Sequence, residues 1–423
     1  MAIGKLRAHI APGHRDRARF RLRQSQLASA MAADTEIAFL FIGGAHQVFH
    51  LAPVAAELSR LLPDTLINCF FPDEETGAAL LRVKTVMNAR AMRLTRIATP
   101  RWAAALARIF RHHSLLKGPL LLRLAPHLAH VQAIVTPERT SAALRFIGLR
   151  HKLMIHFRHG AGDRAPHSEA RLKAFDLIVV PGEKDLARAV EVQHVDPARL
   201  GRCGYVKLDF LSKISASPHR YFDNDRPVII YNPHFDPALS SWPMARAVLA
   251  LFSRQDRYNL IFAPHIRLSE DMTAEEIESW NALAEKDHIL IDLHSPRLLD
   301  MSYIAAADIY LGDMSSQLYE FLARPRPAVF LNTHKVSWRG DPRYAGWQLG
   351  EVVDDLADLM AAIDRAVANH PALAKEQAAA VRAAFGPYAG AIGCGARLIA
   401  SATGRRTNPP SDRLKNSGIH SPE

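Results

Sequence analysis

The chain has 423 residues, 48% hydrophobic and 22% charged, so it is long enough for two folded domains and too apolar to be disordered throughout. Its 53 Lys and Arg residues outnumber 42 Asp and Glu residues, which gives a net charge of +11. Residues 82–123 contain ten of these basic residues and no acidic one, and residues 1–30 contain seven basic residues and one acidic one. The basicity is therefore local, and the body of the chain is mildly acidic.

Three cysteines are spaced far apart and form no CxxC pair, which argues against a disulfide scaffold or structural zinc site and favours a reducing compartment. No apolar segment has the pattern of a signal peptide or the length of a membrane span. We expect residues 1–33 to be a disordered basic arm and residues 404–423 a disordered tail. The sequence thus predicts a cytoplasmic protein.

Five apolar runs alternate with helical periods in the first half of the chain, and each has the length of a buried strand. These runs are residues 37–42, 65–71, 131–136, 153–157 and 177–180. The first run ends in Gly43-Gly44 and is followed by a helical pattern, which is typical of the start of a βα unit.

A second series of apolar runs follows a polar, irregular stretch at 212–227. These runs are residues 228–231, 260–263, 289–292, 309–312 and 328–331. The last long helical segment is predicted at 373–385, before Gly386-Pro387. Two βα series joined by a linker predict two doubly wound, Rossmann-like α/β domains that face a cleft, at 34–215 and 216–403.

Polar segments rich in histidine follow many of these strands, where open α/β sheets bind ligands. They are GGAHQ (43–47), RHGAGDR (158–164), NPHFD (232–236), APHIR (263–267), LHSP (293–296) and GDMSSQLYE (312–320). A single histidine in such a place is often an ordinary loop residue. Its recurrence at one edge of the fold indicates a binding site.

The segment at 312–320 predicts a phosphate site at a helix start. Ser315 and Ser316 are suited to cap the helix, whose first N–H groups and dipole attract an anion. Glu320, one turn further on, is placed to accept hydrogen bonds from ribose hydroxyls. The alternative is an ordinary capped helix.

Basic and histidine side chains elsewhere complete the expected chemistry. His265 is suited to donate to a phosphate oxygen, with Arg267 or Lys207 neutralising charge. His159, followed by Gly160 in the other domain, is suited to act as a general base across the cleft. No tight carboxylate cluster is evident, so neither a metal nor a cofactor is predicted.

In order along residues 130–335, these segments resemble the motifs of the CDP-glycerol glycerophosphotransferase family, which makes teichoic-acid-type polymers on the GT-B fold. The family motifs are H-G-T, G-x-P-R-x-D, a P-T-W-R-type loop, H-P after a strand, and T-D-Y-S-S with a downstream acidic residue. The corresponding segments here are 159–161, 204–209, 232–236, 264–266 and 312–316 with Glu320.

The sequence departs from these motifs at several positions. Ala161 replaces the threonine, Val206 a proline, Lys207 an arginine, His234-Phe235 the Trp-Arg pair and Ile266 a proline. The departures leave the nucleotide-diphosphate half of the resemblance better supported than the identity of the transferred group.

The resemblance implies a transferase that moves a glycerophosphate or related group from a CDP-linked donor to a hydroxyl of a cell-envelope polysaccharide or lipid-linked acceptor, with release of CMP. It implies His159 and His265 as catalytic residues. The implied binding residues are Gly160, Arg164, Lys207, Asn232, His234, Arg267, Asp313, Ser315, Ser316 and Glu320.

The basic segment 82–123 has an amphipathic pattern around Trp102 that suits an anionic membrane surface, and the enzyme is then expected on the inner face of the cell membrane. A core-packing helix with a solvated basic face fits the same pattern.

Four other functions stay open at the level of sequence. The first two are a nucleotide-sugar glycosyltransferase for capsule or lipopolysaccharide, and a non-hydrolysing sugar epimerase of the same architecture. A relative that binds nucleotides without catalysis is the third. The fourth, a nucleic-acid-binding protein, is disfavoured because no zinc-finger spacing, RNP-like strand or basic helix-turn-helix is present.

Overall fold

A computed structural model describes residues 36–404, apart from 101, 104–115, 161, 164–168, 215–218, 271, 285 and 295. The predicted basic arm and, beyond Gly404, the predicted tail therefore lie outside the described residues. So do Arg164 and the middle of the basic segment.

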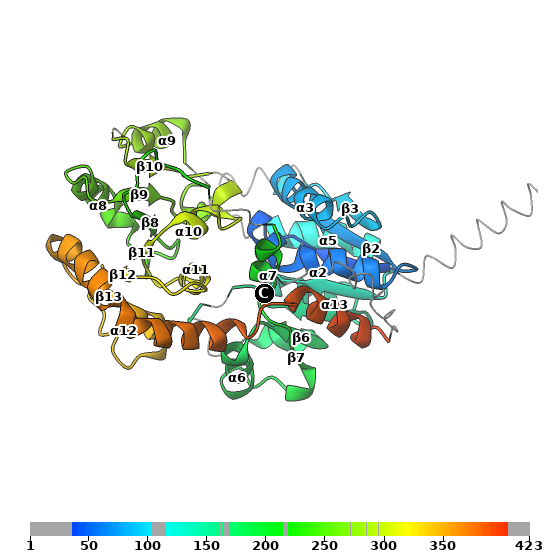
Figure 1. The fold of residues 1–423 in the computed structure, drawn as a ribbon. Coiled ribbons are helices and arrows are strands. Elements are labelled where there is room, and N and C mark those ends of the chain that lie inside the picture. Colours follow the sequence, from blue (N-terminus) through cyan, green and yellow to red (C-terminus); the bar gives the residue numbers. More distant parts are fainter. Residues whose placement is uncertain are drawn as a thin grey trace, which may run out of the picture.

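The chain forms two parallel sheets, each flanked by helices and contained in its own lobe (Figure 1). The first sheet has seven strands in the order β3-β2-β1-β4-β5-β6-β7. Its strands are β1 Glu36–Leu40, β2 Leu66–Phe71, β3 Met92–Arg96, β4 Ala133–Thr136, β5 Leu153–Phe157, β6 Leu177–Val180 and β7 Leu200–Arg202. The order reverses direction between β1 and β4, as in a doubly wound fold.

The second sheet has six strands in the order β10-β9-β8-β11-β12-β13, and its order reverses between β8 and β11. Its strands are β8 Val228–Asn232, β9 Asn259–Phe262, β10 Ile289–Ile291, β11 Ile309–Gly312, β12 Ala328–Leu331 and β13 Glu351–Val353. The predicted fold of two Rossmann-like α/β units facing each other is thus confirmed.

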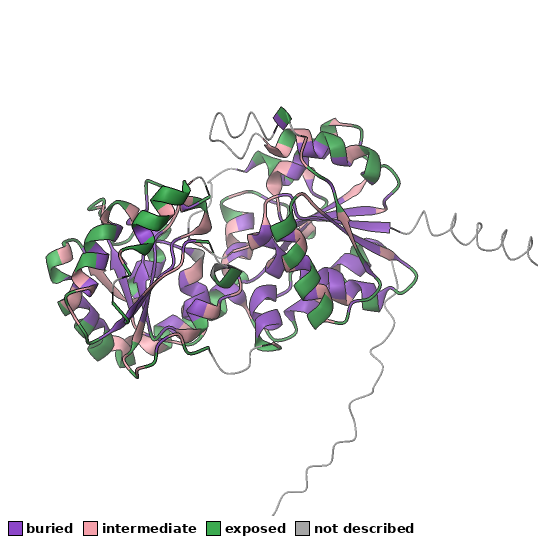
Figure 2. Ribbon diagram, turned by 90° about the horizontal axis from the view of Figure 1, so that it is seen from above, coloured by how far each residue is buried: buried purple, intermediate pink, exposed green. Residues whose placement is uncertain are grey.

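Helices cover both faces of each sheet, so that the central strands are buried on both sides (Figure 2). The helices beside the first sheet are α2 Val48–Leu61, α3 Glu74–Val86, α5 Lys117–Leu128, α6 Glu183–Glu191 and α7 Val206–Ser212. Those after β8 are α8 Ala245–Phe252, α9 Ala274–Asn281, α10 Ser302–Ala306, α11 Ser316–Phe321, α12 Leu359–Phe385 and α13 Ala391–Ala402.

All ten predicted strands are present, and three further strands, β3, β7 and β13, were missed. Each of the three lies at the edge of its sheet. Their sequences, MRLTR, LGR and EVV, are short or carry charged side chains, and only one residue of each strand is buried. Edge strands lack the continuous apolar pattern by which buried parallel strands are recognised.

The last two helices join the lobes. Helix α12 ends before Gly386 as predicted, but it begins at Leu359 and continues through Pro371. A Cβ on Gly182, at the start of α6, would lie 2.4 Å from the Ala384 carbonyl oxygen, so this glycine allows α12 to reach the first lobe.

Helix α13, drawn in red in Figure 1, then packs against α2 and α7. The domain range predicted from the sequence, 216–403, assigned this helix to the second domain, whereas Ala396 and Ile399 are buried in the core that contains α2. No helix was predicted over Ala391–Ala402, whose sequence AIGCGARLIASA contains two glycines and whose N-cap residue, Gly390, makes no side-chain cap hydrogen bond.

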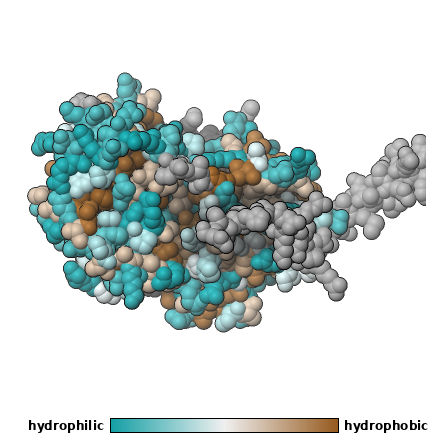
Figure 3. All heavy atoms as spheres, in the orientation of Figure 1, coloured by the Kyte–Doolittle hydropathy of each residue, from teal (hydrophilic) through white to brown (hydrophobic). Residues whose placement is uncertain are grey.

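On the face drawn in Figure 3 hydrophilic residues predominate and hydrophobic ones occur in small groups. Every helix within the described ranges is too short or too polar to cross a bilayer. The basic segment runs into α5, which buries Leu120, Leu121, Leu124 and Leu128, and Trp102 in the same segment is 61% exposed.

Candidate active site

A cavity of about 770 Å³ lies at the carboxyl ends of strands from both sheets. Segments that follow β4, β5, β8, β9 and β11 all line it. This is the place where a doubly wound sheet binds its ligands.

Eight of the residues predicted from the sequence line this cavity. They are His159, Gly160, Lys207, His234, Arg267, His265, Ser315 and Glu320. Arg164 lies outside the described residues, and of Ser316 only the backbone, at the start of α11, is described.

Asn232 and Asp313 were also predicted to bind substrate, but they do not line the cavity. The Asn232 side chain donates to the Ala263 carbonyl at 2.5 Å and so ties the end of β8 to the end of β9. Asp313 is fully buried and accepts hydrogen bonds from the backbone N–H groups of His234 and Ser241, both at 2.8 Å. Both residues therefore shape the loops that carry His234 and His265.

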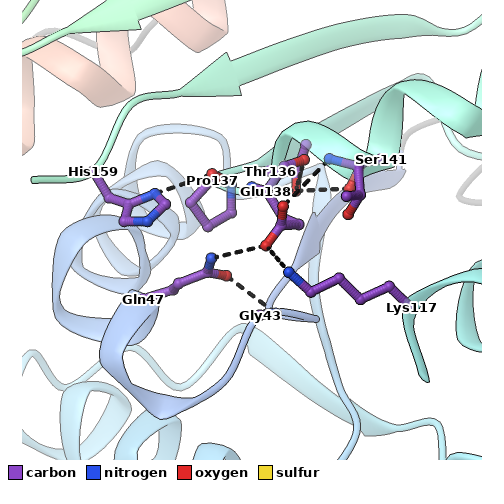
Figure 4. A network of polar contacts seen from close by, with 9 residues as sticks. Gly43, Gln47, Lys117, Thr136, Pro137, Glu138, Ser141 and His159 are labelled. Carbon is purple, nitrogen blue, oxygen red and sulfur yellow. Dashed lines mark hydrogen bonds and ion pairs between the residues drawn. The ribbon is translucent and has the colours of Figure 1, made fainter. Parts of the chain in front are cut away.

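The hydrogen bond of His159 determines which of its nitrogens is basic. Nδ1 lies 3.0 Å from the Pro137 carbonyl oxygen, which can only accept, so Nδ1 carries the proton of the neutral ring (Figure 4). The lone pair of Nε2 is then available as a base. Gly160 follows with φ at +74°, a conformation that favours glycine and turns the chain away from the ring.

His234 and His265, from the second sheet, have the opposite tautomer. The backbone N–H of Asp236 donates to Nδ1 of His234 at 3.0 Å, and that of Arg267 donates to Nδ1 of His265 at 3.3 Å. In each neutral ring Nε2 therefore carries the proton and is a hydrogen-bond donor. The centroids of the two rings lie 6.0 Å apart.

Helix α11 has six residues and begins as predicted, with the Ser315 hydroxyl accepting from the Gln317 N–H at 3.2 Å. The glutamate in this helix does not stand free for a ribose. Glu320 is buried and accepts from Lys207 Nζ at 3.0 and 3.1 Å and from the Tyr205 hydroxyl at 2.6 Å. Lys207 was predicted to neutralise phosphate charge and Glu320 to bind the ribose, but in the structure these two side chains bind each other.

Several lining residues were missed. Gln47 and Lys117 both contact Glu138, at 3.4 and 2.7 Å, beside His159 (Figure 4). The lysine holds the pKa of Glu138 at about 2, against the effect of burial. Glu138 follows the predicted strand 131–136 directly, so the rule used for the other strands would have found it.

The rings of His46 and His50 each lie 6.0 Å from that of His159. Burial is the main cause that lowers the pKa values of both, and it also lowers the pKa of His159 to about 4 and that of His265 to about 3. All four rings are therefore neutral at neutral pH, while Arg267 supplies a fixed positive charge at the rim. Within the described ranges, no group of three or more His, Cys, Asp or Glu side chains is arranged to hold a metal ion.

These pKa values predict that mild acid destabilises the fold. His46, His50, His159, His265 and the buried His156, whose pKa is about 3, all take up protons more readily when unfolded, near pH 6.5. Their contribution to stability is complete above pH 6.5 and is lost as the pH falls, by up to about 1.4 kcal/mol per pH unit for each ring.

Asp313 has the opposite effect on stability, because burial raises its pKa to about 7 and the fold therefore gains stability from Asp313 as the pH falls. This single carboxyl group is outweighed by the five histidines. Urea unfolding at pH 7.5, 6.0 and 5.0 is expected to show a midpoint that falls steadily. A midpoint that is constant or rises towards pH 5 would contradict the buried, neutral state of the histidines.

Comparison with known proteins gives structural likeness only. No protein-family model matches the chain, and no curated protein matches its sequence. Among solved structures, the wall teichoic acid polymerase TagF soaked with CDPG is similar over 93% of this chain and 99% of its own, with a TM-score of 0.56 and 13% identity.

Two further structures are alike to a similar degree. The S. aureus MnaA–UDP structure matches over 89% of this chain and 99% of its own, with a TM-score of 0.58 and 13% identity. The UDP-GlcNAc 2-epimerase from Neisseria meningitidis bound to UDP-GlcNAc matches over 87% and 99%, with a TM-score of 0.55 and 12% identity. These likenesses establish the fold as a two-domain α/β structure of the GT-B type.

Proposed function

We propose that the protein is a transferase for cell-envelope polymers that moves a glycerophosphate or related group from a CDP-linked donor to an acceptor hydroxyl. The observation that carries this proposal is the pairing of opposite histidine tautomers across one cavity. On the first sheet His159 has an unprotonated Nε2, and on the second sheet His234 and His265 present Nε2–H donors. A base on one side and anion-binding donors on the other are what transfer of a phosphoryl group to a hydroxyl requires.

The reaction follows from this placement. The acceptor oxygen forms a bond to the distal phosphorus of the donor as its proton passes to Nε2 of His159. The bond between that phosphorus and the bridging oxygen breaks, and both electrons leave with CMP. His234, His265 and the positive charge of Arg267 stabilise the charge that develops on the phosphate oxygens.

The nucleotide-bound neighbours support a nucleotide-linked donor, since the TagF structure was soaked with CDPG and the MnaA structure holds UDP. The alternative donor is a nucleotide sugar, used by a glycosyltransferase for capsule or lipopolysaccharide or by an epimerase. The two glutamates that line the cavity are both engaged by lysines, Glu138 by Lys117 at 2.7 Å and Glu320 by Lys207 at 3.0 Å. A histidine is therefore the better base, which favours the phosphoryl transferase.

The test is a thermal-shift panel of CDP, CMP, UDP and GDP, followed by a turnover assay. Purified protein with CDP-glycerol and a lipid-linked acceptor is expected to release CMP, and CDP to raise the melting temperature more than UDP does. Stabilisation by UDP alone, with turnover of a UDP-sugar, would favour the alternative. Binding of CDP with no turnover of any donor would identify a protein that binds nucleotides without catalysis.

A peripheral position on an anionic membrane surface, through residues 82–123, stays part of this proposal because a lipid-linked acceptor has to be reached there. The exposed Trp102 and Leu122, each 61% exposed, are the described apolar side chains of this segment that suit such contact.

A further inference from the structure

The cavity extends beyond the space between the two sheets, onto the far face of the first sheet. Leu172, Ile178 and Ala189 line it and belong to the apolar cluster that α5 and α6 cover. His46, in the turn just before α2, and His50, in the first turn of α2, also line it, but the apolar side chains of α2 belong to the other cluster. The cavity therefore has a second compartment that the proposed donor site does not use.

Among the arginines beside this compartment, Arg158 makes the longest side-chain hydrogen bond with the described residues. Its side chain is 18% exposed, and Nη1 donates to the Gln193 side chain at 3.4 Å, at the limit of a hydrogen bond. Its ion pair with Asp185 is also long, at 3.4 Å. A guanidinium has five N–H donors, so within the described ranges most of the donors of Arg158 have no partner at close range.

The neighbouring arginines differ in this respect. Arg188 donates to the carbonyl oxygens of Gly162 and Asp163 at 3.1 and 2.8 Å. Arg139 and Arg171 both bind Glu169, at 2.6 and 2.7 Å. These three side chains therefore each have close partners within the protein.

Asp185 explains how Arg158 is held in place. Its carboxylate is 1% exposed, and neither oxygen accepts a hydrogen bond. It faces Arg158 and Arg188 at 3.4 and 3.6 Å, so it compensates their charge without occupying the donors of Arg158. The carboxylate holds the guanidinium in place, and the guanidinium donors that stay without a close partner among the described residues are of the type that binds an oxyanion.

We propose that this compartment is the acceptor subsite and that Arg158 binds an oxyanion, a phosphate or a carboxylate, carried by the acceptor near its reacting hydroxyl. The proposal rests on the proposed transferase function and deepens it. Arg158 directly precedes His159 and lies close enough to be among the charges that lower its pKa. An acceptor held by its oxyanion at Arg158 thus brings its hydroxyl towards His159.

The experiment measures binding of small probes to wild-type protein saturated with CDP, which fills the donor site. The probes are glycerol 3-phosphate, glycerate and neutral glycerol, so that phosphate, carboxylate and the hydroxyls alone are distinguished. The main variant is Arg158→Gln combined with Asp185→Asn, which removes both charges together and leaves neither buried alone. Arg202→Gln, an exposed arginine paired with Glu183 on α6, is the matched control.

We expect one or both anionic probes to bind the CDP complex of wild type and of Arg202→Gln, and the double variant to bind them at least tenfold more weakly. The affinity for CDP should change by less than twofold in both variants. Equal binding of neutral glycerol, no binding of either anion to wild type, or unchanged affinity in the double variant would overturn the subsite. Wild type that binds an anionic probe but not CDP would contradict the proposed donor and leave the oxyanion site standing.

Discussion

His159→Ala is expected to lower the rate of donor turnover by about 10²–10⁴-fold, the contribution typical of a positioned general base. The variant should still bind CDP, because the donors proposed to contact the diphosphate, His234 and His265, follow strands of the second sheet. Turnover is measured as CMP release at saturating donor and acceptor.

A second substitution separates catalysis from folding. In His159→Asn the amide nitrogen can replace Nδ1 and keep the hydrogen bond to Pro137, but no basic nitrogen takes the place of Nε2. It is therefore expected to be as inactive as the alanine variant and as stable as wild type. His151→Asn, exposed just before β5, is the control and should keep full activity. Full activity in His159→Asn would show that His159 is not the base.

The pH dependence gives an independent test of the same residue. His159 acts as a base only when neutral, and its pKa in the free protein is about 4, chiefly because of burial. The acid limb of kcat/KM, which reports the free enzyme, should therefore lie well below pH 6.5. A bound diphosphate favours the protonated ring, so the acid limb of kcat should lie at a higher pH than that of kcat/KM. Brief assays, with activity recovered at pH 7, separate this effect from acid unfolding.

The sequence was sufficient to predict the buried centre of the fold. The central strands are mostly apolar runs, because parallel strands with helices on both faces have no polar side, whereas the edge strand β3, MRLTR, carries Arg93 and Arg96 and was missed. Five of the six polar segments predicted at strand ends contribute residues to the cavity, whereas the segment 293–296 does not.

The chemistry of individual side chains could be predicted only in part. Asn232 and Asp313 occupy motif positions at the strand ends, yet their polar atoms bind neighbouring loops. The tautomer of His159 depends on the carbonyl of Pro137, which belongs to a different strand. Contacts of this kind join residues far apart in the sequence, and no local pattern encodes them.

The pair formed by Lys207 and Glu320 is expected to carry the largest effect on stability. Their side chains are 7% and 3% exposed, and they join α7, beside the first sheet, to α11, which follows β11 in the second. Lys207→Met leaves the Glu320 carboxylate buried with the Tyr205 hydroxyl as its remaining partner. Removing one member of a buried ion pair costs about 3–5 kcal/mol, and we expect a loss of that size in the free energy of unfolding.

The double variant of Lys207→Met and Glu320→Gln should be more stable than Lys207→Met alone. It contains no unpaired charge, and the glutamine oxygen still accepts from Tyr205. Arg96→Met, which breaks an exposed pair with Glu74, is the control and should change the stability by less than about 1 kcal/mol. Urea unfolding of wild type, Lys207→Met, Glu320→Gln and the double variant gives the coupling between the two residues. If the losses of the two single substitutions simply add in the double variant, the ion pair does not connect the lobes energetically, and other contacts between them must do so.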